Sequence, residues 1–281
     1  MMNKWFTLAE YAHAAYGDEA DIIWRGCVLR VPSVSPPDPT WYPDSVMGFI
    51  VVEAMPFGAD PYGASGLLVA SGDKAGLMHV IFPEESLPKG YVYGLSTAWL
   101  IANWKKWVYP RGNAESVLIR DPESILRMPA VKSQRWKNSS RQNRPHTMSN
   151  WRTLTTYGSD VIRRGCILRV PSVPPPEQEW DDAVGCLTWY PDPVVDFIVV
   201  DADSFEGRSG LLVASGHKSG LVPVVFPKES VLQSAGGLST AWLIANWKKW
   251  VYPWGSAESV LVREPETILR MPAVKSPRRK S

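Results

Sequence analysis

Cysteine and histidine are scarce in this chain of 281 residues, with three and four copies respectively. Cys27, Cys166 and Cys186 show no paired spacing, which argues against a disulfide framework and for a reducing compartment. No histidine–glutamate metal motif, cysteine–histidine cluster or Walker-type phosphate loop occurs, so we expect no metal and no cofactor. No apolar run reaches the ~18–20 residues of a membrane helix, and no basic segment followed by an apolar one opens the chain. We therefore expect a cytoplasmic protein without a membrane partner.

The most informative feature that is present is a block that occurs twice without a change. Gly94–Pro110 and Gly237–Pro253 both read GLSTAWLIANWKKWVYP. Further matched blocks run through nearly all of the two halves, so the sequence predicts two copies of one domain. The copies differ in length around residues 55–63, which are extra in the first, and 177–186, which are extra in the second. Insertions of this kind are typical of surface loops.

Charge divides the chain into four predicted segments. The first copy (1–133) has 11 basic against 14 acidic residues, and the second copy (148–276) has 12 against 14. The polar linker 134–147 carries a net +4 and the tail 277–281 a net +3, so the total of +2 hides two mildly acidic domains. A domain that holds nucleic acid by its phosphates shows the opposite distribution.

The pattern of apolar residues predicts an α+β fold for each copy, with a mainly antiparallel sheet of about five strands and one helix packed on it. In the first copy the predicted elements are strands at 27–31, 49–52, 67–70 and 77–82, a helix at 97–108 and a strand at 117–119. Leu100, Trp104 and Trp107 follow an i, i+4, i+7 spacing, and Ser96 or Thr97 is the expected N-cap of the helix. Glycine-rich residues between the third and fourth strands predict a hairpin.

Histidine chemistry finds no support in the duplicated sequence. His79 stands where the second copy has Pro223, and His217 stands where the first copy has Asp73. A duplicated active site that used histidine would be expected to keep it in both copies. Cysteine is matched at Cys27 and Cys166, but free cysteine is among the most buried residue types and no matched histidine could serve as its base. We interpret both cysteines as structural.

Two other motifs also favour structural interpretations. The acidic pair Glu84–Glu85 becomes Lys228–Glu229 in the second copy, so only one acid is shared and a solvated turn is the better interpretation. The segment Ser71–Gly76 lacks the glycine spacing and following helix of a phosphate loop, and its composition is typical of a tight hairpin. We therefore predict that the chain is not an enzyme.

Exposed tryptophans and acidic loops are the features that suggest binding. The tryptophan-rich helix with its two lysines could stack bases, but an amphipathic core helix explains most of it; Trp99 lies partly off the apolar stripe and could anchor a partner. Proline-stiffened loops carry acidic residues beside tryptophan, which suits contact with a basic protein surface, although an ordinary solvent loop explains them equally well. The candidate contact residues are Asp38, Trp41, Asp44, Trp99, Glu177, Glu179, Trp180, Asp181, Asp182 and Trp242.

The repeated block, together with IWRGC from Ile23 and GLLVASGDKAGL from Gly66, resembles immunity protein family forty-five of bacterial polymorphic toxin systems. The likeness extends from about Trp5 to about Pro129 and again from about Trp151 to about Pro272. It implies an antidote that binds a toxin domain in the cytosol without catalysis. Members of the family are usually single small domains, so the tandem form is unusual.

We therefore expect a cytoplasmic immunity protein whose two copies bind different toxins, or bind one toxin more tightly because they are linked. An alternative from another class is a nucleic-acid-associated protein that uses the basic linker and tail. The residues that would carry this alternative are Arg135, Lys137, Arg141, Arg144, Arg278, Arg279 and Lys280.

Overall fold

The computed structural model describes residues 4–14, 21–32, 46–54, 64–91, 94–122, 151–172, 192–203, 208–232 and 237–265. In the first copy the elements are β1 (Phe6–Thr7), α1 (Leu8–Ala14), β2 (Ile22–Ile23), β3 (Val28–Pro32), β4 (Val46–Ala54), β5 (Ala64–Val69), β6 (Met78–Ile81), β7 (Leu95–Ser96), α2 (Thr97–Trp107) and β8 (Leu118–Arg120). In the second copy they are β9 (Arg152–Thr153), β10 (Val161–Ile162), β11 (Ile167–Pro171), β12 (Val194–Asp203), β13 (Arg208–Val213), β14 (Val224–Val225), β15 (Val231–Leu232), β16 (Gly237–Ser239), α4 (Thr240–Trp250) and β17 (Leu261–Arg263). Short 3-10 turns occupy 84–86, 114–116, 154–156, 228–230 and 257–259.

Each copy is built on one main antiparallel sheet with the same strand order, accompanied by a small sheet of β2 and β7 in the first copy and of β10, β16 and β15 in the second. The first sheet runs β1-β8-β3-β4-β5-β6 and the second runs β9-β17-β11-β12-β13-β14. The hairpin predicted between the third and fourth strands is present as β5 and β6, which pair antiparallel. The α+β class is thus confirmed, and each main sheet has one strand more than expected because residues 6–7 and 152–153 add β1 and β9 at an edge.

The matched helices α2 and α4 begin and end as the sequence predicts. The side chain of Ser96 accepts a hydrogen bond from the amide of Trp99 at 3.1 Å, and the side chain of Ser239 accepts one from the amide of Trp242 at 3.3 Å. These serines satisfy amides that the first helical turn leaves without partners. Leu100 and Trp104 of α2 are buried against the sheet, so this apolar stripe anchors the helix in the core.

The two copies differ at the N-terminal end of the domain. In the first, Thr7 and Glu10 form a capping box: the Thr7 amide donates to Glu10 Oε2 at 2.8 Å, and the Glu10 amide donates to Thr7 Oγ1 at 3.1 Å. This box starts α1, a helix that the sequence analysis did not predict. The second copy has Thr156 where the first has Glu10, and a 3-10 turn at 154–156 replaces the helix.

Each copy has a complete hydrophobic core between its sheet and its outer helix. Leu29, Phe49 and Trp104 are fully buried in the first, and Leu168, Phe197 and Trp247 take the matched places in the second. Because each core is assembled within one copy, each copy has what an independently folding domain needs.

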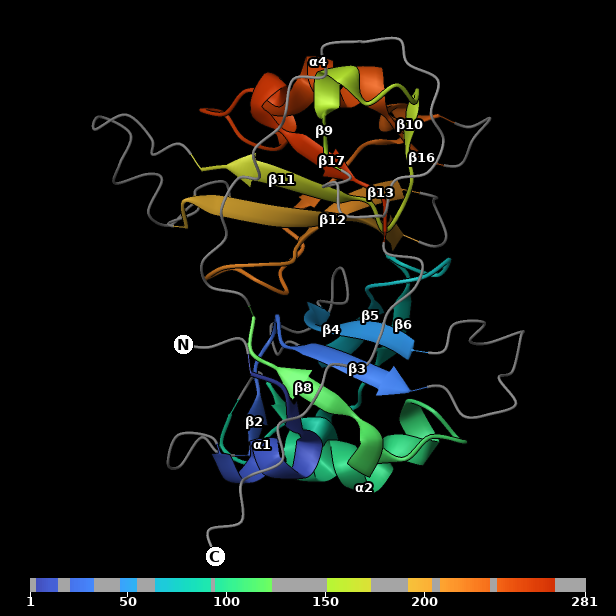
Figure 1. Cartoon of the computed structure of the whole chain (residues 1–281), viewed down its shortest axis with the longest axis vertical. Helices are drawn as coiled ribbons and strands as arrows, with labels where there is room; N and C mark the ends of the chain where they lie inside the picture. The colour runs from blue at the N-terminus through green and yellow to red at the C-terminus, as the bar shows by residue number, and fades with distance from the viewer. Residues whose placement is uncertain are drawn as a thin grey trace, which may run out of the picture.

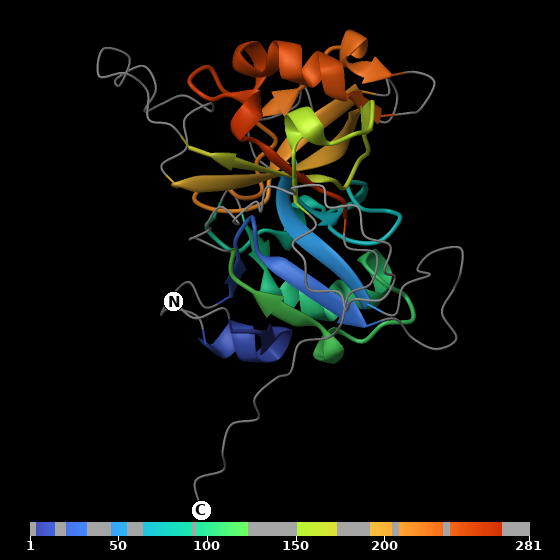
Figure 2. The same cartoon turned by 45° about the horizontal axis from the view of Figure 1, so that its top comes forward.

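The two sheets pack face to face, which gives four layers in the order helix, sheet, sheet, helix. Figure 1 shows α2 and α4 on opposite outer sides with the sheets between them, and Figure 2 shows the same arrangement after rotation. A third apolar cluster, separate from both cores, joins the inner sheet faces. In the described ranges, no helix has the length and apolar character needed to cross a membrane.

Candidate functional site

The sequence-predicted contact residues divide into two groups in the structure. Trp99 and Trp242 belong to the outer helices α2 and α4 and are described. The remaining eight candidates lie outside the described residues, as do the basic linker and tail: Asp38, Trp41, Asp44, Glu177, Glu179, Trp180, Asp181 and Asp182. The structure therefore locates one predicted contact residue in each copy.

A second tryptophan accompanies Trp99 on the outer helix. Trp99 and Trp107 are both half-buried, with ring centroids 6.2 Å apart and an interplanar angle of 45°. Trp99 also meets the buried ring of Phe82 edge-on, at 5.6 Å and 72°. The ring of Trp107 has the ammonium group of Lys106 at 5.3 Å from its centroid, within cation–π range. We call Trp99, Lys106 and Trp107 the outer aromatic surface of the first copy.

The second copy repeats this geometry closely. Trp242 and Trp250 are 6.2 Å apart at 48°, and Trp242 meets Phe226 at 5.6 Å and 73°. Lys249 lies 5.8 Å from the centroid of Trp250. Trp242, Lys249 and Trp250 form the outer aromatic surface of this copy, and because α2 and α4 are outer layers, the two surfaces lie on opposite sides of the molecule (Figure 1).

The placement of Trp107 differs from the prediction. The spacing Leu100, Trp104, Trp107 predicts a single buried stripe; Leu100 and Trp104 are buried, whereas Trp107 is only partly buried and packs against the core beside Trp99. Trp107 is the last residue of α2 and still packs against the core, and the next residue, Val108, is buried. The pairing of Trp107 with Trp99 could have been predicted from their separation of eight residues, because this spacing places both on neighbouring parts of the helix surface, about two turns apart.

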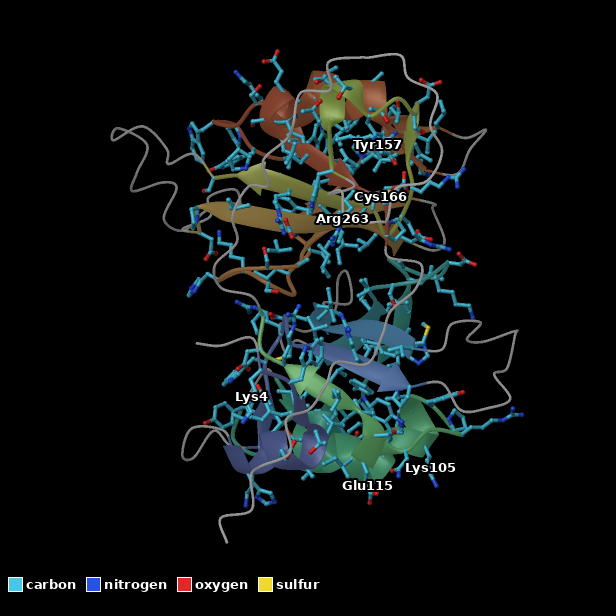
Figure 3. All side chains as sticks on the ribbon, viewed as in Figure 1. Lys4, Lys105, Glu115, Tyr157, Cys166 and Arg263 are labelled. Atoms are coloured by element: carbon cyan, nitrogen blue, oxygen red, sulfur yellow. The ribbon has the colours of Figure 1, made fainter. Side chains whose placement is uncertain are left out.

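A polar cluster of a buried tyrosine, a buried cysteine and an exposed carboxylate links the N-terminal segment, the start of β3 and the end of β8 in the first copy. The Tyr11 hydroxyl donates to Asp121 Oδ1 at 2.8 Å and lies 3.6 Å from Cys27 Sγ. In the second copy Tyr157 contacts Glu264 and lies 3.8 Å from Cys166 Sγ. Figure 3 labels Tyr157 and Cys166, which come from neighbouring parts of the second copy. The cysteines stand out in the sequence as a matched pair, whereas their matched tyrosine and carboxylate partners carry no motif that would single them out.

This cluster keeps its thiols protonated. Burial raises the pKa of Cys27 to about 12, although the hydrogen bond between Cys27 and Tyr11 opposes the rise. Burial, followed by the nearby Glu264 carboxylate, raises the pKa of Cys166 to about 12. The thiolate is the nucleophilic form of cysteine, so this environment suppresses nucleophilic chemistry. The prediction that both cysteines are buried is confirmed.

Arginine–tryptophan stacks fix the first strand of each copy to its neighbours. The guanidinium groups of Arg30 and Arg120 each lie 5.0 Å from the Trp5 ring centroid. In the second copy Arg169 and Arg263 lie 4.7 and 4.9 Å from the ring of Trp151. Figure 3 shows Arg263 in the second copy, near the side of its sheet that faces the first.

One charged contact of these stacks is specific to the second copy. Arg169 forms two 2.7 Å hydrogen bonds to the carboxylate of Asp196, whose matched position in the first copy is Gly48. The stacks have an evident structural use, because they hold the N-terminal segment on the sheet.

The surrounding geometry does not form a metal centre in the described ranges. No group of three or more histidine, cysteine, aspartate or glutamate side chains is placed there to hold a metal ion. His79 is held in the fold by a backbone contact after α2. It contacts the carbonyl of Val108 at 2.9 Å, and burial lowers its pKa, which favours the neutral ring.

Comparison with known proteins identifies the family to which the chain belongs. No curated protein and no solved structure matches the chain. The model of the family described as Immunity protein 45 matches it twice, over residues 14–119 and 154–262. These two stretches cover most of the chain and contain both outer aromatic surfaces and most of each sheet, while the edge strands β1 and β9 precede them. The chain therefore belongs to the Immunity protein 45 family and carries two copies of its domain.

Proposed function

We propose that this protein is a cytoplasmic immunity protein that binds a bacterial polymorphic toxin domain and neutralises it by protein–protein contact without catalysis. The observation that carries the proposal is the double match to the Immunity protein 45 family. The protonated, buried thiols support a binding role over a nucleophilic one.

The outer aromatic surfaces are the proposed contact sites. Half-buried tryptophans offer a large apolar area with few rotatable bonds, and tryptophan is enriched among the residues that dominate binding energy. Trp99 and Trp242 are held by neighbouring aromatic rings and by their helix caps, so they lose little freedom when a partner covers them. The lysines beside Trp107 and Trp250 would meet acidic groups of the toxin.

The helices that carry the two surfaces are opposite outer layers (Figure 1), an arrangement that favours a separate partner at each copy. We therefore propose that one chain binds two toxin domains, one at each copy. Native mass spectrometry of the complex should show two toxin domains per chain.

The test is to co-express the chain with the toxin domain encoded beside its gene and to measure the affinity of the purified complex. Changing both Trp99→Ala and Trp242→Ala should weaken binding by about 30-fold or more, the effect of losing an interfacial anchor. Lys105→Ala with Lys248→Ala is the matched control, because both lysines are exposed on the same helices; Figure 3 shows Lys105 pointing out from the first copy.

The acidic loops provide a competing contact site within the same function. Trp41→Ala with Trp180→Ala tests them, and a large loss with this pair but none with the helix pair would move the contact to the loops. Failure of the unaltered chain to form any complex at micromolar concentration would contradict the immunity function itself.

A further inference from the structure

The inner faces of the two sheets meet through six apolar side chains that are identical in kind between the copies. Ile50, Val52 and Leu68 come from β4 and β5, and Ile198, Val200 and Leu212 come from the matched places on β12 and β13. All six are at most 4% exposed. This cluster is distinct from the two domain cores, since the neighbouring residues Phe49, Val51 and Leu67 point to the helix side.

Reciprocal backbone hydrogen bonds join the same two faces. The amide of Glu53 donates to the carbonyl of Gly220 at 3.2 Å, and the amide of Asp201 donates to the carbonyl of Gly76 at 3.2 Å. Glu53 matches Asp201 and Gly76 matches Gly220 in the repeat. A contact in which residue i meets j while j meets i is the signature of a two-fold interface between like subunits.

The glycine of the Arg-Gly-Cys sequence that occurs in both copies, Gly26 and Gly165, makes the close packing of the two sheets possible. A Cβ atom on Gly26 would lie 2.4 Å from Cβ of Ser219 in the other copy, and one on Gly165 would lie 2.4 Å from Cβ of Ala75. Both glycines also have φ angles in the left-handed region, at 85° and 83°. The hairpin turn of each copy thus rests on the RGC glycine of the other.

We infer that this face is a self-association surface whose partner is a second copy of the same domain, so that the second copy alone would form a homodimer. A pair of second copies would bury the same apolar set, with Ile198, Val200 and Leu212 present twice. Gly165 would then face Ser219, which is the same contact that Gly26 makes here. The inference is independent of what the outer surfaces bind.

The charges around the face are compatible with such a pair. Arg25 is held within its own copy by Glu53 at 2.8 Å. Arg164 reaches across the interface to the backbone carbonyl of Asp73 at 3.5 Å. His217 takes the place of Asp73 in the second copy and offers the same carbonyl, so the contact does not need the aspartate side chain.

The experiment measures the mass of residues 148–276 in solution by light scattering coupled to size exclusion. The expected result is a dimer at micromolar concentration. Leu212→Asp should give a folded monomer, because it places a carboxylate in the middle of the apolar face. Lys248→Asp, an exposed position on the outer helix, should leave the dimer intact. A folded, monomeric second copy would overturn the inference.

If residues 148–276 do not fold alone, a second measurement tests whether two second copies associate. In the full chain, residues 1–133 are replaced by residues 148–276 so that two second copies flank the natural linker, and small-angle scattering is recorded. A radius of gyration equal to that of the native chain supports self-association. An expanded particle of two separate domains overturns it.

Discussion

The matched cysteines should resist alkylation in the native protein. The perturbation is iodoacetamide at pH 8, applied to a Cys186→Ser chain so that Cys27 and Cys166 are the remaining thiols. With a pKa of about 12, roughly one thiol in ten thousand is ionised at this pH, against roughly one in ten for the ordinary value of 9.0. Ionisation alone therefore slows the reaction by about a thousandfold, and burial of both sulfur atoms adds to this.

The assay is mass spectrometry of the whole chain after increasing times with the reagent. The native protein should remain unmodified while the same protein in denaturant gains two labels quickly. Rapid labelling of either cysteine in the folded chain would refute the reasoning, since it would show an accessible thiolate. That result would also reopen nucleophilic catalysis, because both copies possess the cysteine and its tyrosine neighbour.

Three further outcomes follow from burial, backbone geometry and proton binding. Trp104→Ala should lower the free energy of unfolding by about 3–5 kcal/mol in urea titrations, and Trp99→Ala by clearly less, because Trp104 is 1% exposed and Trp99 is half-buried. Gly90→Ala should cost about 1–2 kcal/mol in the same assay from its left-handed backbone alone; Gly76→Ala should cost more, because its Cβ would lie 2.6 Å from a carbonyl oxygen of the second copy. The pKa of Cys27 is raised on folding, so its contribution to stability is complete below about pH 9 and is lost as the pH rises toward 12. Unfolding free energy measured across that range should fall less steeply in a Cys27→Ala chain.

The sequence predicts the elements whose signals are local. The N-cap of α2 follows from Ser96 and the apolar spacing behind it, and the β5–β6 hairpin follows from glycine-rich residues between two apolar runs. Repetition strengthens these predictions, because the second copy forms the matched elements. Helix α1 was missed although Thr7 and Glu10 have capping-box spacing, since the segment is only seven residues long.

Contacts between distant segments could not be predicted from one sequence. The apolar run at 49–52 identifies a strand. The run has no polar residue because both faces of the strand are buried, one against the outer helix and the other against the second copy. The surface that covers the inner face of this strand belongs to the other domain, and no local sequence pattern specifies how the two domains pack. The partnership of Tyr11 with Asp121 likewise spans 110 residues and leaves no periodic signal.

The connection after the first long strand of each sheet differs in length between the copies, but the central strand pairing is unchanged. Residues 33–45 join β3 to β4, whereas the longer stretch 172–193 joins β11 to β12. The strand registers are nevertheless equivalent: Phe49 pairs with Val69, and Phe197 pairs with Val213. A slip of one residue would exchange the core face for the inner face and destroy both apolar clusters at once. Burial of both faces of the central strands therefore places this change in length in a loop. Under the proposed function, these loops, with their unlike acidic residues, are where the two copies would come to prefer different toxins while they share the same tryptophan surface.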